Sequence, residues 1–326
     1  LLMDSNGNLL SAITHGHQTE TYIYWINSMF GGYKGWYNNT SVTSVSIPRT
    51  RTISYGAFYG CSNLSNVDIS DRVSRIADSA FYQCSSLTSI VIPDTVKSIG
   101  KYAFSWCKNL KEVTLPISAE YAVFETDAAT SQSSFALCSK VQKITYTVGD
   151  GSVFVPESSK YMCTLPSAAS NMLATVVYEE GITEIPACAL YVYNCYCGAL
   201  VSVTLPSTVK KIGNYAFYGC SGLRSAYYNG GRNDWNAIAI GANNDSLLAA
   251  KLYFLVAGDI NGSGAEPDAS DLQCLYTYLS KREAEGAYQD DLDLFLSMAD
   301  VNGDGVVNIL DYQRLYMALT GAAPLR

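Results

Sequence analysis

The sequence is poor in histidine and in charge. Its only two histidines are His15 and His17, and charged side chains make up 15% of the 326 residues. A Cys–His nucleophile or a Ser–His–Asp triad needs a histidine beside the nucleophile. Both histidines precede the repeats described below, so we exclude a cysteine peptidase and a triad hydrolase. A His-x-His pair can bind a metal, but no third ligand is suggested nearby, and we interpret both residues as surface polar groups.

Long apolar runs and basic clusters are also missing. No run of about 18 apolar residues occurs, which predicts no membrane span. The chain begins Leu1-Leu2-Met3 with neither a basic region nor an apolar core, so we expect no signal peptide in it and a processed or truncated chain. The net charge is −8, with 12 acidic and 4 basic residues from position 258 onwards and 17 of each before it. This balance predicts no nucleic-acid partner.

The ten cysteines do not form a zinc-type pair of pairs. The one close pair, Cys195 and Cys197, has a single residue between its members, and we interpret it as structural. Three other cysteines, Cys61, Cys84 and Cys107, follow one another at intervals of 23 residues. Each of these three ends the phrase Ala-Phe-x-x-Cys, and the phrase returns at Ala216-Phe217 before Cys220.

An alternating apolar segment opens each repeat, and a further aliphatic residue lies between this segment and the phrase. The alternating segments are Val45–Ile47, Val67–Ile69, Ile90–Ile92, Val113–Leu115 and Val203–Leu205, and the aliphatic residues are Ile53, Ile76, Ile99 and Ile212. A period near 23 with one short strand per repeat predicts a solenoid, in which stacked coils share a core. One cysteine per coil could form a redox or disulfide series, but we favour a stack of small buried thiols.

The phrase Ile-Gly-x-Tyr-Ala-Phe-x-x-Cys resembles the BspA-like branch of the leucine-rich repeats. The resemblance covers about Val42 to Val256, and Tyr227 to Phe254 looks like the closing coil of that family. It implies an α/β solenoid that serves as a cell-surface or secreted binding scaffold, and it implies no activity. Residues 1–41 are an irregular N-terminal segment, with strands expected near Leu9–Ile13 and Thr21–Trp25.

The middle of the solenoid is irregular. Phe135 and Cys138 keep the phrase spacing, and we expect two further strands at Ile144–Tyr146 and Val176–Tyr178. Residues 147–174 between them are long and rich in Ser, Gly and Pro. Such an insertion falls on one face of a solenoid, where it is either a binding element or a decorative loop.

The solenoid sequence offers candidates for two other classes of site. Tyr59, Tyr82 and Tyr218 each follow a core phenylalanine and would form a row. This row could stack on sugar in a polysaccharide-binding module, but packing between neighbouring coils is favoured. Paired carboxylates could make a polysaccharide hydrolase. No spacing singles out Glu179, Glu180 or Glu184, so we interpret them as a solvated face and predict no enzyme.

The C-terminal region carries oxygen-bearing residues at the spacing of an EF-hand calcium loop. Gly305 stands at position 6, where a sharp turn is needed. Asp stands where most EF-hands have Glu at position 12. The expected ligands are Asp300, Asn302, Asp304, the carbonyl of Val306, Asn308 and Asp311.

A related loop precedes this one by about 40 residues. It is one residue longer, and Ser replaces Asp at position 5, so we expect a distorted or weaker site. Its expected ligands are Asp259, Asn261, Ser263, the carbonyl of Ala265, Asp268 and Asp271. Each loop leads into a segment with Asp, Gln, Leu, Tyr and Leu in register, beginning at Asp271 and Asp311.

Two such loops, each leading into a short helix, resemble the dockerin module of cellulosome proteins. The resemblance covers Gly258 to about Gly321. It implies a small all-α, EF-hand-like module that binds two Ca²⁺ ions and a cohesin on a scaffolding protein. The family's partner contacts map to Ile309, Leu310, Tyr316 and Met317 in the second copy, and to Ala269, Ser270, Tyr276 and Thr277 in the first.

The predicted architecture is therefore an α/β leucine-rich-repeat solenoid (42–257) between the N-terminal segment (1–41) and a calcium-binding dockerin module (258–326). The resemblances imply a secreted, cellulosome- or cell-surface-associated component. Its solenoid would bind a protein in the leading hypothesis, a polysaccharide in the second, and would be a hydrolase in the third. Because only the second copy carries apolar residues at all four contact positions, we expect cohesin binding in one orientation through that copy.

Overall fold

The computed structural model describes residues 2–3, 9–11, 36–47, 50–121, 134–148, 172–190, 197–281, 288 and 291–325. Several predicted features lie outside the described residues: the two histidines, the expected strand Thr21–Trp25, Cys195 and most of the 147–174 insertion. No helix in the described part of the chain is long and apolar enough to span a membrane.

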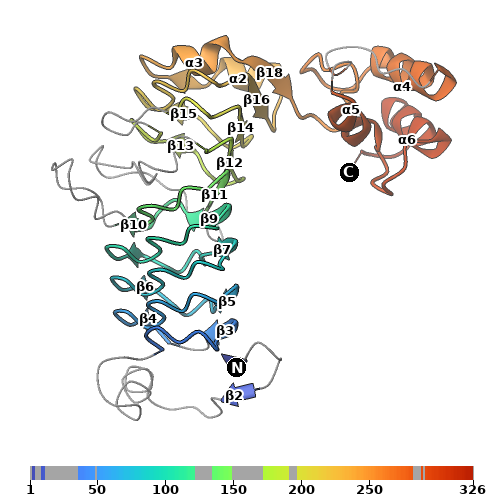
Figure 1. Cartoon of the computed structure of the whole chain (residues 1–326). Coiled ribbons are helices and arrows are strands. Elements are labelled where there is room, and N and C mark those ends of the chain that lie inside the picture. Colours follow the sequence, from blue (N-terminus) through green and yellow to red (C-terminus); the bar gives the residue numbers. More distant parts are fainter. Residues whose placement is uncertain are drawn as a thin grey trace.

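The solenoid is built from coils that each contribute one strand to the same face (Figure 1), and these strands form two hydrogen-bonded parallel sheets that are divided between residues 69 and 89. Apolar residues alternate with polar ones along these strands, so one side of each strand is buried and the other is solvated. The strands predicted within the solenoid are confirmed, including the two in its irregular middle. The strands are β3 (Ser44–Ile47), β5 (Asn66–Ile69), β7 (Ser89–Val91), β9 (Glu112–Pro116), β11 (Lys143–Thr147), β12 (Thr175–Tyr178), β14 (Ser202–Leu205), β16 (Ser225–Tyr228) and β18 (Lys251–Phe254).

A second face consists of two-residue strands that pair in parallel and bury one isoleucine in most coils. Ile53, Ile76 and Ile99 are in register with one another, as are Ile185 and Ile212. These strands are β4 (Thr52–Ile53), β6 (Arg75–Ile76), β8 (Ser98–Ile99), β10 (Glu120–Tyr121), β13 (Glu184–Ile185), β15 (Lys211–Ile212) and β17 (Ala239–Ile240). The predicted aliphatic positions are therefore core positions.

Phenylalanine and cysteine of each phrase bind one coil to the next. The rings of Phe58, Phe81 and Phe104 stack with centroids 5.2 and 5.1 Å apart. The Cys84 thiol donates to the Phe58 carbonyl at 3.2 Å, and the Cys107 thiol donates to the Phe81 carbonyl at 3.3 Å. The repeat cysteines Cys61, Cys84, Cys107 and Cys220 are buried and form no disulfide, which confirms the interpretation as packed thiols.

Both ends of the solenoid are closed by other structure. At the first coil, β1 (Leu2–Met3) pairs antiparallel with β3 and with β2 (Leu9–Ser11), which confirms part of the N-terminal strand prediction. At the last coil, short helices α2 (Arg232–Asn236) and α3 (Asp245–Ala249) flank β16 and β18. An open sheet edge can pair with other chains. These elements lie at the two ends of the solenoid, where its sheets would otherwise be open.

A helical module lies beside the last coil (Figure 1) and contains α4 (Ala269–Lys281), α5 (Leu292–Ala299) and α6 (Ile309–Leu319). Strand β18 belongs to two cores. Phe254 packs in the solenoid core, whereas its neighbour Tyr253 packs in the core of the module. The other buried residues of the module core are Ile260, Leu275, Tyr288, Phe295, Ala299, Val301 and Leu315.

We expect Phe81→Ala to lower the free energy of unfolding of the solenoid by about 3–5 kcal/mol, the usual cost of truncating a buried aromatic ring. Phe81 is fully buried between two stacked rings. Tyr55→Ala is the matched control, because Tyr55 is 73% exposed. Denaturant unfolding measures both. A loss below about 1 kcal/mol for Phe81→Ala would contradict the assigned core position.

Calcium-type loops and the exposed face of the second repeat

The second loop is organised by its two terminal carboxylates. Asp300 Oδ1 accepts the N–H of Asp304 at 3.1 Å, and its Oδ2 accepts the N–H of Gly305 at 2.8 Å. Asp311 accepts the N–H groups of Asn302 and Asn308 at 3.1 and 2.8 Å. Asn308 and Asp311 also form a capping box at the start of α6. The loop is therefore curled around its carboxylates and joined rigidly to the helix.

The first loop has the same hydrogen-bond frame. Asp259 accepts the N–H of Ser263 at 2.9 Å and of Gly264 at 2.7 Å. Asp271 accepts the N–H of Asn261 at 2.9 Å and of Asp268 at 2.8 Å. The additional residue in this loop leaves the frame unchanged, so the expected distortion is not found in these bonds. A weaker first site stays a prediction.

Three of the predicted ligands are buried carboxylates. Asp259, Asp271 and Asp311 are each at most 1% exposed. Burial raises the pKa of Asp259 and Asp271, although backbone N–H groups act in the opposite direction. Within the described residues the one ion pair joins Lys211 to Glu184. Buried carboxylates without a basic partner are stabilised by a bound cation.

The remaining predicted ligands suit a hard cation. They are amide, hydroxyl, carboxylate and carbonyl oxygens, the ligand set of Ca²⁺. No group of three or more His, Cys, Asp and Glu side chains comes together as a metal cluster in the part of the chain that the structure describes. The mixed oxygen ligands and the buried carboxylates are the features of the two loops that favour calcium.

Two family models match parts of the chain. Residues 32–152 and 166–238 match the BspA type leucine rich repeat region, in six copies. The chain belongs to the BspA-type leucine-rich repeat family. Residues 257–320 match the dockerin type I domain, which contains both loops. Both are non-catalytic modules, and no enzyme family is indicated.

Several solved structures are similar to this BspA-type chain. A leucine rich cell surface protein from Faecalibacterium prausnitzii is 26% identical over 63% of this chain and 64% of that one, with a TM-score of 0.26. The leucine rich repeat protein of T. pallidum is 24% identical over 58% and 68%, with a TM-score of 0.32. One from Eubacterium ventriosum is 24% identical over 66% and 44%, with a TM-score of 0.34. The chain thus spans 64% of the first protein's length. A comparison with curated proteins gives no match.

In the dockerin, the second repeat exposes the four predicted contact residues. Ile309, Leu310, Tyr316 and Met317 are between 42% and 58% exposed. They lie on α6 as two adjacent pairs seven residues apart, and a spacing of seven returns to the same helix face.

The predicted core face of the two helices is confirmed. Leu275 and Leu315 are buried, and Leu272, Leu279, Tyr312 and Leu319 pack against the module core.

The first repeat differs from its prediction at one position. A contact position must face solvent, but Thr277, which is one of the four positions mapped in the first copy, is only 7% exposed. Its hydroxyl donates to the carbonyl of Gln273 at 2.9 Å, a bond that satisfies the polar group inside the module. Helix α4 therefore cannot present a face equivalent to that of α6, even though Ala269, Ser270 and Tyr276 are exposed.

The tyrosine row is a stack rather than an open platform. Tyr37, Tyr59 and Tyr82 lie with ring centroids 4.4 and 4.6 Å apart and interplanar angles of 9° and 19°. Their faces thus cover one another along the solenoid. Tyr218 instead meets Tyr215 edge to face, at 5.5 Å. A sugar ring needs an open aromatic face, so this geometry favours packing between coils over polysaccharide binding.

The three acids considered for hydrolysis occupy separate environments. Burial and the nearby Asp94 raise the pKa of Glu179. Burial acts on Glu180 in the same direction, but hydrogen bonds from Ser207 and Asn229 outweigh it and lower the pKa. Glu184 pairs with Lys211 at 2.7 Å. The bonds of Glu180 and Glu184 join neighbouring coils, whereas Glu179 is exposed to solvent.

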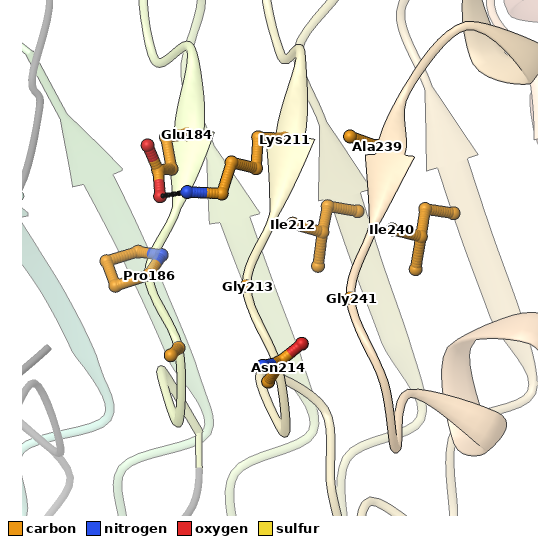
Figure 2. A pocket seen from close by; sticks show the side chains of 10 residues that line it. Glu184, Pro186, Lys211, Ile212, Gly213, Asn214, Ala239, Ile240 and Gly241 are labelled. Carbon is orange, nitrogen blue, oxygen red and sulfur yellow. Dashed lines mark hydrogen bonds and ion pairs between the residues drawn. The ribbon is translucent and has the colours of Figure 1, made fainter.

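A shallow depression of about 350 Å³ lies over β13, β15 and β17, and Figure 2 shows Glu184 and Lys211 meeting at its rim. Gly213 and Gly241 are among the residues that line it. A Cβ on Gly213 would lie 2.3 Å from the backbone nitrogen of Ala187, so close contact between coils requires glycine there. The depression is therefore a consequence of coil stacking.

Buried thiols make the solenoid sensitive to alkali. Burial raises the pKa of Cys61 from its usual 9 to about 12, and it raises the pKa of Cys84 and Cys107 well above 9. Between pH 9 and 12 the unfolded chain releases thiol protons that the folded chain retains, so stability falls as pH rises.

We therefore expect the denaturation midpoint of the solenoid to fall from pH 8 to pH 10, in keeping with the direction of these pKa shifts. Cys84→Ala and Cys107→Ala should each reduce this pH dependence, although both lose packing. The exposed-site variant Tyr55→Ala is a control for general alkaline effects. An unchanged pH dependence in the cysteine variants would contradict the role of the thiols.

Proposed function

We propose that this protein is a secreted cellulosome-type component. Its dockerin would bind a cohesin of a scaffolding protein in a calcium-dependent way, and its solenoid would serve as a protein-binding module. The observation that carries the proposal is the exposed apolar face of α6, formed by Ile309, Leu310, Tyr316 and Met317. Exposed apolar patches on small domains commonly mark interfaces.

Calcium binding is part of this proposal. Two ions would be held, one by Asp259, Asn261, Ser263, Ala265, Asp268 and Asp271, and one by Asp300, Asn302, Asp304, Val306, Asn308 and Asp311. Bound calcium would supply positive charge to the buried carboxylates and cross-link the two ends of each loop. The carboxylates of Asp271 and Asp311 are in the first turns of α4 and α6, so each loop would fix the helix that follows it.

Binding in a single orientation follows from the difference between α4 and α6. The four residues on α6 form one apolar face, whereas the equivalent positions on α4 are Ala269, Ser270, Tyr276 and the buried Thr277. A cohesin that recognises the second repeat would not find an equivalent surface on the first. The combination of a dockerin with a BspA-type solenoid supports a place outside the cell.

Removal of calcium should unfold the dockerin and leave the solenoid folded. The module has a small core, and the free energy of metal binding would contribute much of its stability. Circular dichroism with and without a chelator measures the loss of helix, and denaturant unfolding monitors the solenoid. Helical structure that persists in residues 258–326 under excess chelator would contradict this.

Among ligand variants, Asp300→Ala should weaken calcium binding more than Ser263→Ala. It removes a carboxylate from a loop that it organises, and interactions with charged groups are worth about 1.5–3 kcal/mol. Isothermal calorimetry on the full chain measures the difference. Equal losses for both variants would contradict the predicted order of the two loops.

Leu310→Asp and Met317→Asp should each weaken cohesin binding about 30-fold or more, since a charge would be buried at the centre of the interface. Ala269→Asp and Ser270→Asp are the matched controls, because they place the same charge on the exposed part of α4. A panel of purified cohesins, with and without calcium, provides the partner. Circular dichroism checks that each variant is folded.

Equal weakening by both pairs, or weakening by the α4 pair alone, would overturn the assignment to α6. Absence of binding to every cohesin of the panel in the presence of calcium would count against the proposed function itself.

A further inference from the structure

The first loop of the dockerin contacts the last coil of the solenoid through Arg232, at the start of α2. The Arg232 Nε–H donates to the Ser263 carbonyl at 2.9 Å. The Arg232 backbone N–H donates to the Gly264 carbonyl at 2.6 Å. Its guanidinium lies over the ring of Phe254, 4.7 Å from the centroid. One residue of the solenoid thus holds two consecutive peptide groups of the loop.

A second contact comes from Tyr288, which lies between α4 and α5. Tyr288 is fully buried, its ring stacks on Tyr253 at 6.1 Å, and its hydroxyl donates to the Phe254 carbonyl at 2.6 Å. Burial raises its pKa, and the carboxylates of Asp259 and Asp271 add to this effect. Tyr288 therefore joins the dockerin to the last strand of the solenoid.

The two loops differ most clearly at their central glycines. Gly264 and Gly305 both stand at position 6, with φ of +74° and +84°. Gly264 is buried, and a Cβ there would lie 2.4 to 2.9 Å from the Phe254 ring. A Cβ on Gly305 would meet nothing within 4 Å. The same backbone turn is thus pressed against the solenoid in the first loop and open to solvent in the second.

We propose that the first loop is a calcium-dependent latch between the two domains. Cation binding in this loop and docking of the dockerin onto the last coil stabilise each other, with Arg232 as the positioning residue. The proposal rests on calcium binding by the loops, as set out above. Asp259 organises the loop by accepting the N–H groups of Ser263 and Gly264, whose carbonyls Arg232 holds.

Calcium binding and domain docking must affect each other by the same factor. If the docked arrangement favours the curled loop, it raises calcium affinity, and calcium must favour docking by the same factor. The charge of Arg232 acts in the opposite direction, since a cation near the loop repels calcium. Removal of Arg232 therefore weakens calcium binding if positioning dominates, and tightens it if charge alone matters.

The first test is a calcium titration of the full chain by calorimetry. Asp300→Ala leaves the first loop intact, and Asp259→Ala leaves the second loop intact. Adding Arg232→Ala should weaken calcium binding about tenfold in the Asp300→Ala background and leave it unchanged in the Asp259→Ala background. Arg224→Ala, at another exposed arginine of the solenoid, is the control. Unchanged or tighter binding with Arg232→Ala would overturn the latch.

The second test needs no ligand variant and uses hydrogen exchange with and without calcium. In the unsubstituted chain, calcium should slow exchange of the Arg232 amide, which donates to Gly264, at least tenfold relative to amides in β3 and β5. Gly264→Ala should abolish this protection because the methyl group would collide with Phe254. Gly305→Ala, with a similar positive φ, should retain it.

The outcomes separate the latch from the proposed function. Calcium uptake with no change in Arg232 exchange overturns the latch and leaves calcium-dependent cohesin binding intact. Equal effects of Gly264→Ala and Gly305→Ala also overturn it, because backbone strain would then explain both. Failure of the unsubstituted chain to take up calcium at all defeats both proposals.

Discussion

Stacking of one coil on the next is the interaction on which the rest of this structure depends. A coil of about 23 residues is too thin to bury its own apolar face, so its core residues are covered by its neighbours. Phe81 is covered by Phe58 on one side and Phe104 on the other, and the thiol of Cys107 binds the carbonyl of Phe81. The end coils need closure for the same reason, and β1, α2 and α3 provide it.

The dockerin reaches its structure by different means. Its core is small, and its loops place carboxylates in the interior, where backbone N–H groups are their main described partners. Burying carboxylates without a nearby positive charge is costly, and this supports the proposal that folding of the module responds to calcium. The exposed residues of α6 take no part in the core, so they are available for a partner.

Strand β18 connects the solenoid to the dockerin. Its alternation places Phe254 in the solenoid core and Tyr253 in the dockerin core, so one strand contributes to both domains. Arg232 and Tyr288 add hydrogen bonds on either side of the strand.

The sequence by itself determined the repeat, its buried Phe, Cys and Ile positions, and the ligand spacing of both loops. These features are local or periodic, and a fixed spacing along the chain suffices to place them. Only the tertiary structure decided that Thr277 is buried, that the tyrosine faces cover one another, and that Arg232 holds the first loop. Each of these depends on which surfaces meet in space, and Arg232 and Ser263 are 31 residues apart in the chain. No spacing rule relates a solenoid arginine to a dockerin carbonyl, because their contact arises only when the two domains pack.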